Sequence, residues 1–293
     1  MCDEQTELDN EGFAASGGML NRRDFSKLST AAILALIAPA SALGQEAVEE
    51  STVMVDMPDG VSDCYYVRPS TGKHPAVLIW PDIRGLRSSF KAMGKRMAMQ
   101  GYSVLVVNPF YRDGKAPVVP EGSSFRDPDT RNLLIGMARK LTQDASMSDA
   151  RAYISFLDAQ DAVDTSRKVG TMGYCMGGPL IMRTAGAVPE RVGAAASFHG
   201  GGIVTDRDDS PHLLIPTSPA HVLHAIAEND DQRGPEAKHV LTAAYKAAGI
   251  PAEIEVYEGT LHGWCPPDSS VYNEAQAERA WSRVSALFER ALA

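Results

Sequence analysis

Short apolar runs alternate along this chain with longer amphipathic segments. Five segments of helical period are predicted near residues 89–100, 131–159, 177–188, 235–248 and 273–292, with a break in the second near Ala145-Ser146. Six apolar runs are predicted as strands: Ala76–Trp80, Tyr102–Val107, Lys168–Met172, Ala194–Phe198, Val222–Ala227 and Ile254–Tyr257. Strands that are apolar on both faces and separated by helices predict a doubly wound, mostly parallel α/β sheet with helices on both faces.

Two earlier segments alternate between apolar and polar positions. Thr52–Asp56 and Asp63–Arg68 flank Pro58-Asp59-Gly60, which is typical of a turn, so they predict an antiparallel hairpin at the edge of the sheet. Residues 112–130 are rich in Gly, Pro, Ser and Asp and are predicted as a long loop. No internal repeat interrupts the pattern, so residues 43–293 are expected to form a single domain.

The N-terminal segment has the order of an export signal. Arg22 and Arg23 precede the apolar run Ala31–Ala38, and Ala40-Ser41-Ala42 follows it as a small-residue cleavage site. The paired arginines resemble a twin-arginine signal read by export machinery, which predicts removal of residues 1–42 and a periplasmic or secreted protein. An N-terminal helix that stays attached is the alternative. The apolar run is far shorter than the roughly 20 residues of a membrane-spanning helix, so no permanent membrane span is expected.

Charge and cysteine usage narrow the function classes. The formal net charge of the 293 residues is -9, and no run of Lys and Arg clusters along one face to neutralise phosphates. Both observations argue against nucleic acid as a partner. The four cysteines form no CxxC pair and lack zinc-ligand spacing with histidine, so a metal site is not expected. Loss of Cys2 with the signal would leave an odd number, so at least one thiol should stay free.

One cysteine lies in a context that favours catalysis. The run Gly173-Tyr174-Cys175-Met176-Gly177-Gly178 directly follows a predicted strand and opens a predicted helix. This is the pattern of a nucleophile elbow, in which glycines flank a strained residue because side chains there would collide with neighbouring backbone. The helix N-terminus would also stabilise a thiolate at Cys175.

The remaining members of a catalytic triad follow in the expected order. Asp230 comes after the run Val222–Ala227, and His262 comes after Ile254–Tyr257, so both are expected at the carboxyl edge of the sheet. His262 would accept the thiol proton, and Asp230 would hold its tautomer. The neighbouring Asp231 is the competing candidate for the acid.

These three motifs together resemble the dienelactone hydrolase (carboxymethylenebutenolidase) family of α/β-hydrolases over residues 50–293. The resemblance implies a cofactor-free hydrolase of small esters or lactones with a Cys, His and Asp triad and an acyl-thioester intermediate. It also implies an oxyanion hole formed by the N–H groups of Ile83 and Met176, and an accessory acid, Asp82, near the thiol. Asp82 departs from the glutamate of the founding enzymes, so its contact with the thiol depends on the fold.

Substrate-binding residues are implied less directly. Arg112 matches one of the two carboxylate-binding arginines of the founding enzymes, whereas Pro266 stands where the second would be. The adjacent Tyr111 is a further candidate for substrate binding. His199, at a strand end, and Trp264, beside His262, are further candidates to line the substrate pocket. For Arg112 the alternative is an ion pair with Asp113 or an acid of residues 121–129, and for His199 and Trp264 it is a structural role.

Two other functions compete with hydrolysis. The scaffold could serve a non-catalytic binding protein, because fold does not fix function. Alternatively, Cys175 could belong to a redox-active thiol protein, which would need a resolving thiol such as Cys64 or Cys265 within reach. The identity of the ester or lactone, the physiological pathway and the oligomeric state do not follow from the sequence.

Overall fold

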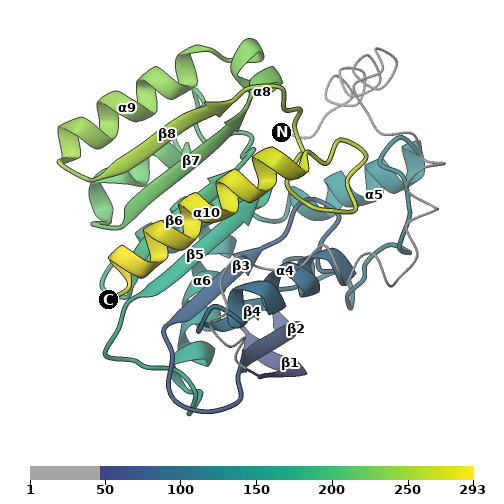
Figure 1. Cartoon of the computed structure of the whole chain (residues 1–293). Helices are drawn as coiled ribbons and strands as arrows, with labels where there is room; N and C mark the ends of the chain where they lie inside the picture. Colours follow the sequence, from purple (N-terminus) through teal and green to yellow (C-terminus); the bar gives the residue numbers. More distant parts are fainter. Residues whose placement is uncertain (1–46) are drawn as a thin grey trace.

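The computed structural model describes residues 47–293, and a single eight-stranded sheet runs through them (Figure 1). Its strand order is β1-β2-β4-β3-β5-β6-β7-β8, and every neighbouring pair from β4 onward is parallel. The strands are β1 Val48–Met57, β2 Gly60–Pro69, β3 Ala76–Trp80, β4 Ser103–Val106, β5 Val169–Tyr174, β6 Val192–Phe198, β7 His221–Ala227 and β8 Ala252–Tyr257. All six strands predicted from apolar runs are confirmed, as is the parallel sheet.

The hairpin of β1 and β2 forms one edge of the sheet. The two strands pair antiparallel from Val48 with Pro69 to Met57 with Gly60, and β2 also pairs antiparallel with β4. Gly60 has φ 141°, a conformation that suits glycine at the end of this tight turn. The predicted edge hairpin is therefore confirmed, with strands longer than the alternating pattern indicated.

Helices cover both faces of the sheet (Figure 1). One face carries α4 and α10, and the other carries α5, α6, α7 and α9. The bounds are α4 Ser88–Ala98, α5 Pro128–Ala138, α6 Gln143–Asp158, α7 Gly177–Ala187, α8 Glu228–Arg233, α9 Glu236–Ala248 and α10 Glu274–Ala291, with a 3₁₀ helix η1 at Pro211–Thr217.

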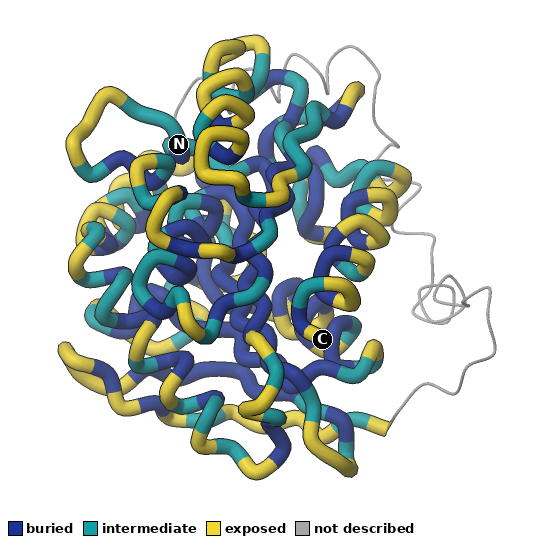
Figure 2. Tube along the Cα trace, turned by 90° about the vertical axis from the view of Figure 1, so that its left-hand side faces the viewer, coloured by how far each residue is buried: buried dark blue, intermediate teal, exposed yellow. Residues whose placement is uncertain are grey.

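Strand alternation divides the core into two layers. In β3, Val77 and Ile79 pack with the α4 and α10 side, while Leu78 and Trp80 pack with the α6 and α7 side. Successive strand residues point to opposite faces, and both faces are covered, so the strand is apolar throughout. Figure 2 shows the result as a buried interior inside a shell of exposed turns and helix faces.

Three details differ from the sequence prediction. The break between α5 and α6 lies at residues 139–142 rather than near Ala145-Ser146, because the Thr142 hydroxyl accepts the Ala145 N–H and starts α6 there. The 112–130 loop ends sooner than predicted, since Asp127 caps α5 by accepting the Thr130 N–H. The short α8 and η1 were not predicted, since six or seven residues are too few to display a helical period.

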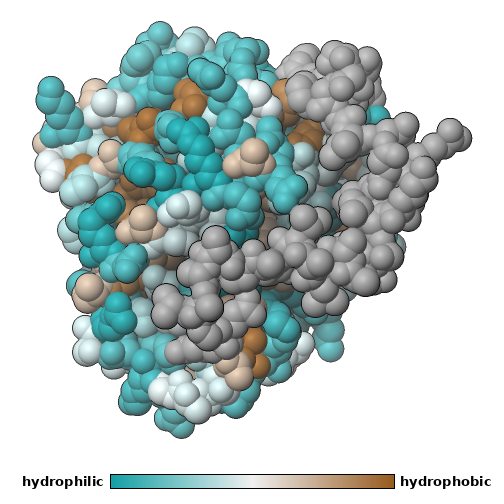
Figure 3. All heavy atoms as spheres, viewed as in Figure 1, coloured by the Kyte–Doolittle hydropathy of each residue, from teal (hydrophilic) through white to brown (hydrophobic). Residues whose placement is uncertain are grey.

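This arrangement is the α/β-hydrolase fold, as predicted. On the face shown in Figure 3 the visible surface is mostly hydrophilic, with small, separate apolar patches. No helix among residues 47–293 has the length and apolar character needed to cross a membrane. The predicted export signal, residues 1–42, lies outside the described residues.

Candidate active site

Cys175 lies in a sharp turn between β5 and α7, at the carboxyl edge of the sheet. Its φ is 52°, in the left-handed region that residues other than glycine rarely adopt. The turn is held by hydrogen bonds from the Cys175 N–H to the Phe198 carbonyl, 3.0 Å, and from the Gly178 N–H to the Cys175 carbonyl, 3.0 Å. The residue is only 2% exposed. This is the strained strand-to-helix turn that the sequence predicts.

The glycines around Cys175 are required by close backbone approach. A Cβ on Gly173 would lie 2.1 Å from the Gly177 carbonyl oxygen, and a Cβ on Gly177 would lie 2.4 Å from the Trp80 carbonyl oxygen. A Cβ on Gly178 would lie 2.5 Å from the Gly200 Cα. Because these neighbours are backbone atoms, they cannot move without displacing a strand or the helix. The predicted reason for the glycines is therefore confirmed.

Replacing Gly173 with Ala is expected to lower the free energy of unfolding by about 3 kcal/mol, because the added methyl group overlaps backbone in a closely packed turn. Urea unfolding followed by circular dichroism measures this change. Gly136→Ala is the matched control, since nothing lies within 4 Å of a Cβ at that position in α5. It should stabilise the protein by up to about 1 kcal/mol through helix propensity. Equal effects of the two changes would contradict the packing explanation.

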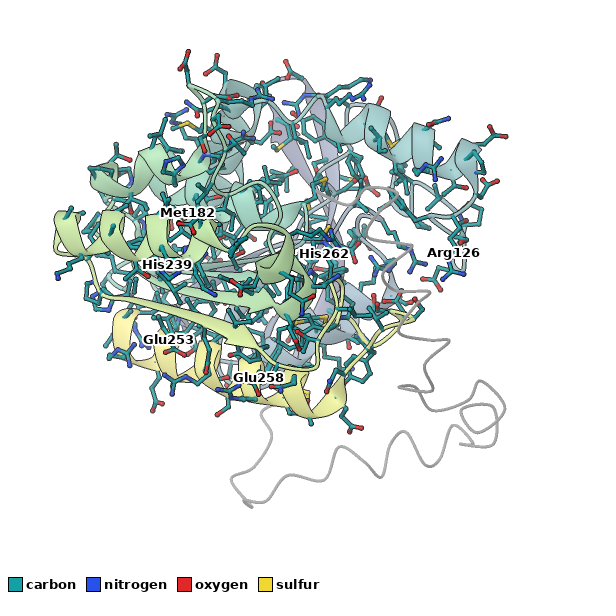
Figure 4. All side chains as sticks on the ribbon, turned by 90° about the horizontal axis from the view of Figure 1, so that it is seen from above. Arg126, Met182, His239, Glu253, Glu258 and His262 are labelled. Atoms are coloured by element: carbon teal, nitrogen blue, oxygen red, sulfur yellow. The ribbon has the colours of Figure 1, made fainter. Side chains whose placement is uncertain are left out.

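His262 and Asp230 form a hydrogen-bonded pair at the same edge of the sheet. The Nδ1 atom of His262 lies 2.7 Å from Oδ2 of Asp230, and the histidine is 3% exposed. In Figure 4, His262 lies near the middle of the molecule, whereas Glu253 and Glu258 lie toward its periphery. Asp231 instead binds Nζ of Lys238 at 2.6 Å. Of the two acids that the sequence left open, Asp230 is the one that contacts the histidine.

Three hydrogen bonds fix the loop that carries His262 to the start of α8. Asn229 Oδ1 accepts the His262 N–H at 2.8 Å, and Glu228 Oε2 accepts the Gly259 N–H at 2.6 Å. In return, the Glu228 N–H donates to the Thr260 hydroxyl at 3.3 Å. Sequence reasoning missed these supports, although Glu228 and Asn229 directly precede Asp230. These hydrogen bonds fix the position of His262 relative to Asp230.

The accessory acid Asp82 is bound within an ion-pair cluster. Both carboxylate oxygens of Asp82 accept hydrogen bonds from the Arg87 guanidinium, at 2.7 and 2.9 Å, and Oδ1 also accepts the Arg84 N–H. Arg87 in turn binds Asp268 through two nitrogens, at 2.6 and 2.9 Å. The cluster joins the loop after β3 to the loop after β8. Its contacts give Asp82 a structural task and show none with the thiol of Cys175.

The predicted oxyanion donors occupy the loop after β3 and the start of α7. Ile83 is buried and follows Asp82, and Met176 follows Cys175. Among the described residues, neither backbone N–H donates a hydrogen bond. The anchoring of the adjacent Asp82 holds the Ile83 loop in place.

Arg112 and Tyr111 belong to a different cluster. The Arg112 guanidinium donates to both oxygens of the buried Asp149, at 2.7 and 2.8 Å, and its Nε donates to Asp59 at 2.8 Å. The Tyr111 hydroxyl donates to Asp149 as well, at 2.8 Å. Each guanidinium nitrogen thus donates to a carboxylate of Asp59 or Asp149. The partners expected from the sequence, Asp113 or an acid of residues 121–129, do not form these ion pairs. These contacts give Arg112 no support as a carboxylate-binding residue for substrate.

His199 lies beside the His262 ring, whereas Trp264 packs into the core. The His199 and His262 ring centres are 5.1 Å apart at an angle of 68°. Burial, together with the nearby His262, holds the pKa of His199 well below its usual range. Trp264 is fully buried and stacks on Tyr257 with ring centres 4.8 Å apart. Of the two predicted pocket residues, His199 has the closer relation to the His–Asp pair.

Two further cysteines lie among the described residues. Cys64 and Cys265 are buried free thiols, and burial raises the pKa of Cys64 to about 12 and also raises that of Cys265. Both are therefore poor nucleophiles. Within residues 47–293, no group of three or more His, Cys, Asp or Glu side chains could hold a metal ion.

Comparison with known proteins is consistent with this geometry. The model of the dienelactone hydrolase family matches residues 62–292. A relative from Salmonella typhi, named "Putative carboxymethylenebutenolidase", is 27% identical over 239 residues, covering 80% of this chain and 82% of its own. A relative of the same name from Synechocystis sp. is 28% identical over 236 residues, covering 78% and 91%.

Solved structures share the fold. The crystal structure of a "Putative Dienelactone Hydrolase" from Klebsiella pneumoniae has a TM-score of 0.72 at 21% identity, covering 84% of this chain and all of its own. A dienelactone hydrolase-like promiscuous phosphotriesterase from metagenomic libraries has a TM-score of 0.67 at 19% identity, with the same coverage. At such identities the likeness concerns the fold alone.

Proposed function

Since the chain belongs to the dienelactone hydrolase family and is a hydrolase, we propose that it cleaves a small carboxylic ester or lactone through a triad of Cys175, His262 and Asp230. The observation that carries the proposal is the strained cysteine turn at the same sheet edge as the His–Asp pair. A strained, glycine-flanked nucleophile position and a histidine oriented by a carboxylate are the parts that acyl transfer needs.

The first half-reaction makes an acyl-enzyme. His262 Nε2 takes the thiol proton of Cys175, and the sulfur attacks the carbonyl carbon, forming a C–S bond and an oxyanion. The N–H groups of Ile83 and Met176 serve as oxyanion donors. Collapse breaks the C–O bond, and the leaving oxygen takes the proton from Nε2. Asp230 accepts the Nδ1 proton in a hydrogen bond throughout and stays ionised, so it fixes the tautomer and stabilises the imidazolium.

The second half-reaction releases the acid. Water attacks the thioester while His262 Nε2 takes its proton, the C–S bond breaks, and Cys175 recovers its proton from the imidazolium. A lactone follows the same steps, but its leaving oxygen stays attached, so the single product is a hydroxy acid. The nucleophilic role requires the reduced thiol, so every assay includes a phosphine reductant.

We assign Asp82 to the Arg87 and Asp268 cluster rather than to the thiol. A buried arginine between two carboxylates ties the loop of Ile83 to the loop that follows His262. Loss of Asp82 would leave the buried Arg87 with Asp268 as its remaining carboxylate partner, and the loop of Ile83 would lose this anchor. The effect of Asp82 on turnover would then pass through the placement of the oxyanion donor.

The test of the proposed function is mass spectrometry of the reduced protein after an activated ester, together with steady-state hydrolysis. We expect a transient acyl adduct on Cys175 and continuous release of acid. A stable protein without adduct or turnover would support the binding-protein alternative. Formation of only disulfide-linked products would support the redox alternative, although the buried thiols Cys64 and Cys265 have raised pKa values that disfavour them as resolving thiols.

We further propose that the protein is exported through the twin-arginine route, with cleavage after Ala42. Arg22-Arg23 and Ala40-Ser41-Ala42 support this proposal. Replacing both arginines with Lys should leave the precursor in the cytoplasm, as measured by fractionation and immunoblotting. Normal amounts of processed protein outside the inner membrane in that variant would refute the twin-arginine assignment and leave only a general secretory one.

A further inference from the structure

His199 shares its backbone strain with Cys175. In the part of the chain that the structure describes, these two are the only residues other than glycine with positive φ, 41° for His199 and 52° for Cys175. The two residues occupy equivalent positions at the ends of neighbouring strands. Tyr174 of β5 and Phe198 of β6 form the last pair of residues in register, and Cys175 and His199 directly follow them. Strain of this kind persists only where surrounding structure enforces it, and it gathers at functional sites.

The His199 ring is buried without hydrogen bonds. It is 1% exposed, and neither Nδ1 nor Nε2 has a hydrogen-bond partner. Burying polar groups without partners costs free energy, and a Phe ring would fill the same space without that cost. Packing against Tyr174, His262 and Trp264 therefore does not explain why the residue is a histidine. A bound ligand could supply the hydrogen-bond partner that the ring nitrogens of His199 lack.

We propose that a ring N–H of His199 binds the leaving oxygen of the substrate, which makes His199 a substrate-binding residue for oxygen esters and lactones. This inference rests on the proposed function. The leaving oxygen must approach His262 Nε2 to receive its proton. With ring centres 5.1 Å apart, one oxygen can lie within about 3 Å of a nitrogen on each ring.

Burial equips His199 for this task. Its lowered pKa keeps the ring neutral, so it presents one N–H donor and does not repel the imidazolium that forms on His262. The proton that cleaves the C–O bond still comes from His262, and His199 donates only a hydrogen bond. As negative charge develops on the leaving oxygen, that hydrogen bond strengthens.

The experiment compares an oxygen ester with the thioester of the same acyl group. Both substrates give the same acyl-Cys175, so differences in kcat/KM report acylation alone. A leaving sulfur is a weak hydrogen-bond acceptor and gains little from a donor. The variants are His199→Phe, which keeps a ring and removes both nitrogens, and His199→Asn, which keeps an N–H donor and tolerates positive φ.

We expect His199→Phe to lower kcat/KM for the oxygen ester by about 10- to 100-fold and for the thioester much less, with partial recovery in His199→Asn. Thermal unfolding confirms that each variant is folded before it is assayed. Equal losses on both substrates, or no loss on either, would overturn the inference and leave His199 a packing residue. A wild-type protein that cleaves neither substrate would instead refute the proposed function itself.

Discussion

Replacing Cys175 with Ala is expected to abolish ester hydrolysis, lowering kcat by at least about four orders of magnitude, and His262→Ala should do nearly the same. The reason is that the thiol and the imidazole act on one proton in one step. Without the sulfur no acyl-enzyme forms, and without the imidazole nothing takes the thiol proton or returns it to the leaving oxygen.

The double variant sharpens this prediction. Members of a triad act as a unit, so Cys175→Ala combined with His262→Ala should lose no more activity than either single change. The measurement is steady-state kcat on an activated ester with the reductant present. Cys64→Ala is the control, because Cys64 is a buried free thiol in β2 and takes no part in the proposed reaction. Retained turnover in Cys175→Ala would rule out the cysteine as nucleophile.

Most of the fold could be predicted from the sequence because the strands and the longer helices each have a local signal. Strands buried on both faces appear as continuous apolar runs, and β3 was predicted to the residue. The turn at Cys175 was readable for a related reason. The backbone contacts that exclude a Cβ at Gly173 and Gly177 leave glycine at fixed offsets, so a tertiary constraint is recorded in local sequence.

Ion pairs between segments that are distant in the sequence produce no local sequence pattern. Arg112 pairs with Asp149 from α6, 37 positions away, and Arg87 binds Asp268 across 181 positions. A charged residue in a sequence does not disclose which opposite charge the fold brings near it. The matched position of Arg112 therefore indicated substrate recognition, whereas the fold engages that guanidinium with buried and exposed carboxylates.

The choice between Asp230 and Asp231 depends on helix geometry, which the sequence likewise does not display. Both residues lie in α8, where successive side chains point about 100° apart around the axis. One carboxylate can then face His262 while its neighbour faces Lys238. A six-residue helix displays no period in the sequence, so only the fold separates the two acids.

Asp230→Asn is accordingly expected to lower kcat by about three to four orders of magnitude while leaving the protein folded. An amide in place of the carboxylate can donate to Nδ1, which favours the tautomer that carries the proton on Nε2. That tautomer cannot take the thiol proton. The neutral amide also lacks the negative charge with which Asp230 stabilises the imidazolium.

Asp231→Asn is the matched control, because it makes the same chemical change one residue away. It removes a partly exposed ion pair with Lys238, which is worth at most about 1 kcal/mol of stability, so turnover should stay within a few-fold of wild type. Both variants are compared by kcat on one activated ester after unfolding curves have confirmed equal folded fractions. An inactive Asp231→Asn beside an active Asp230→Asn would move the acid by one residue. Equal and modest losses would mean that His262 works without a carboxylate partner.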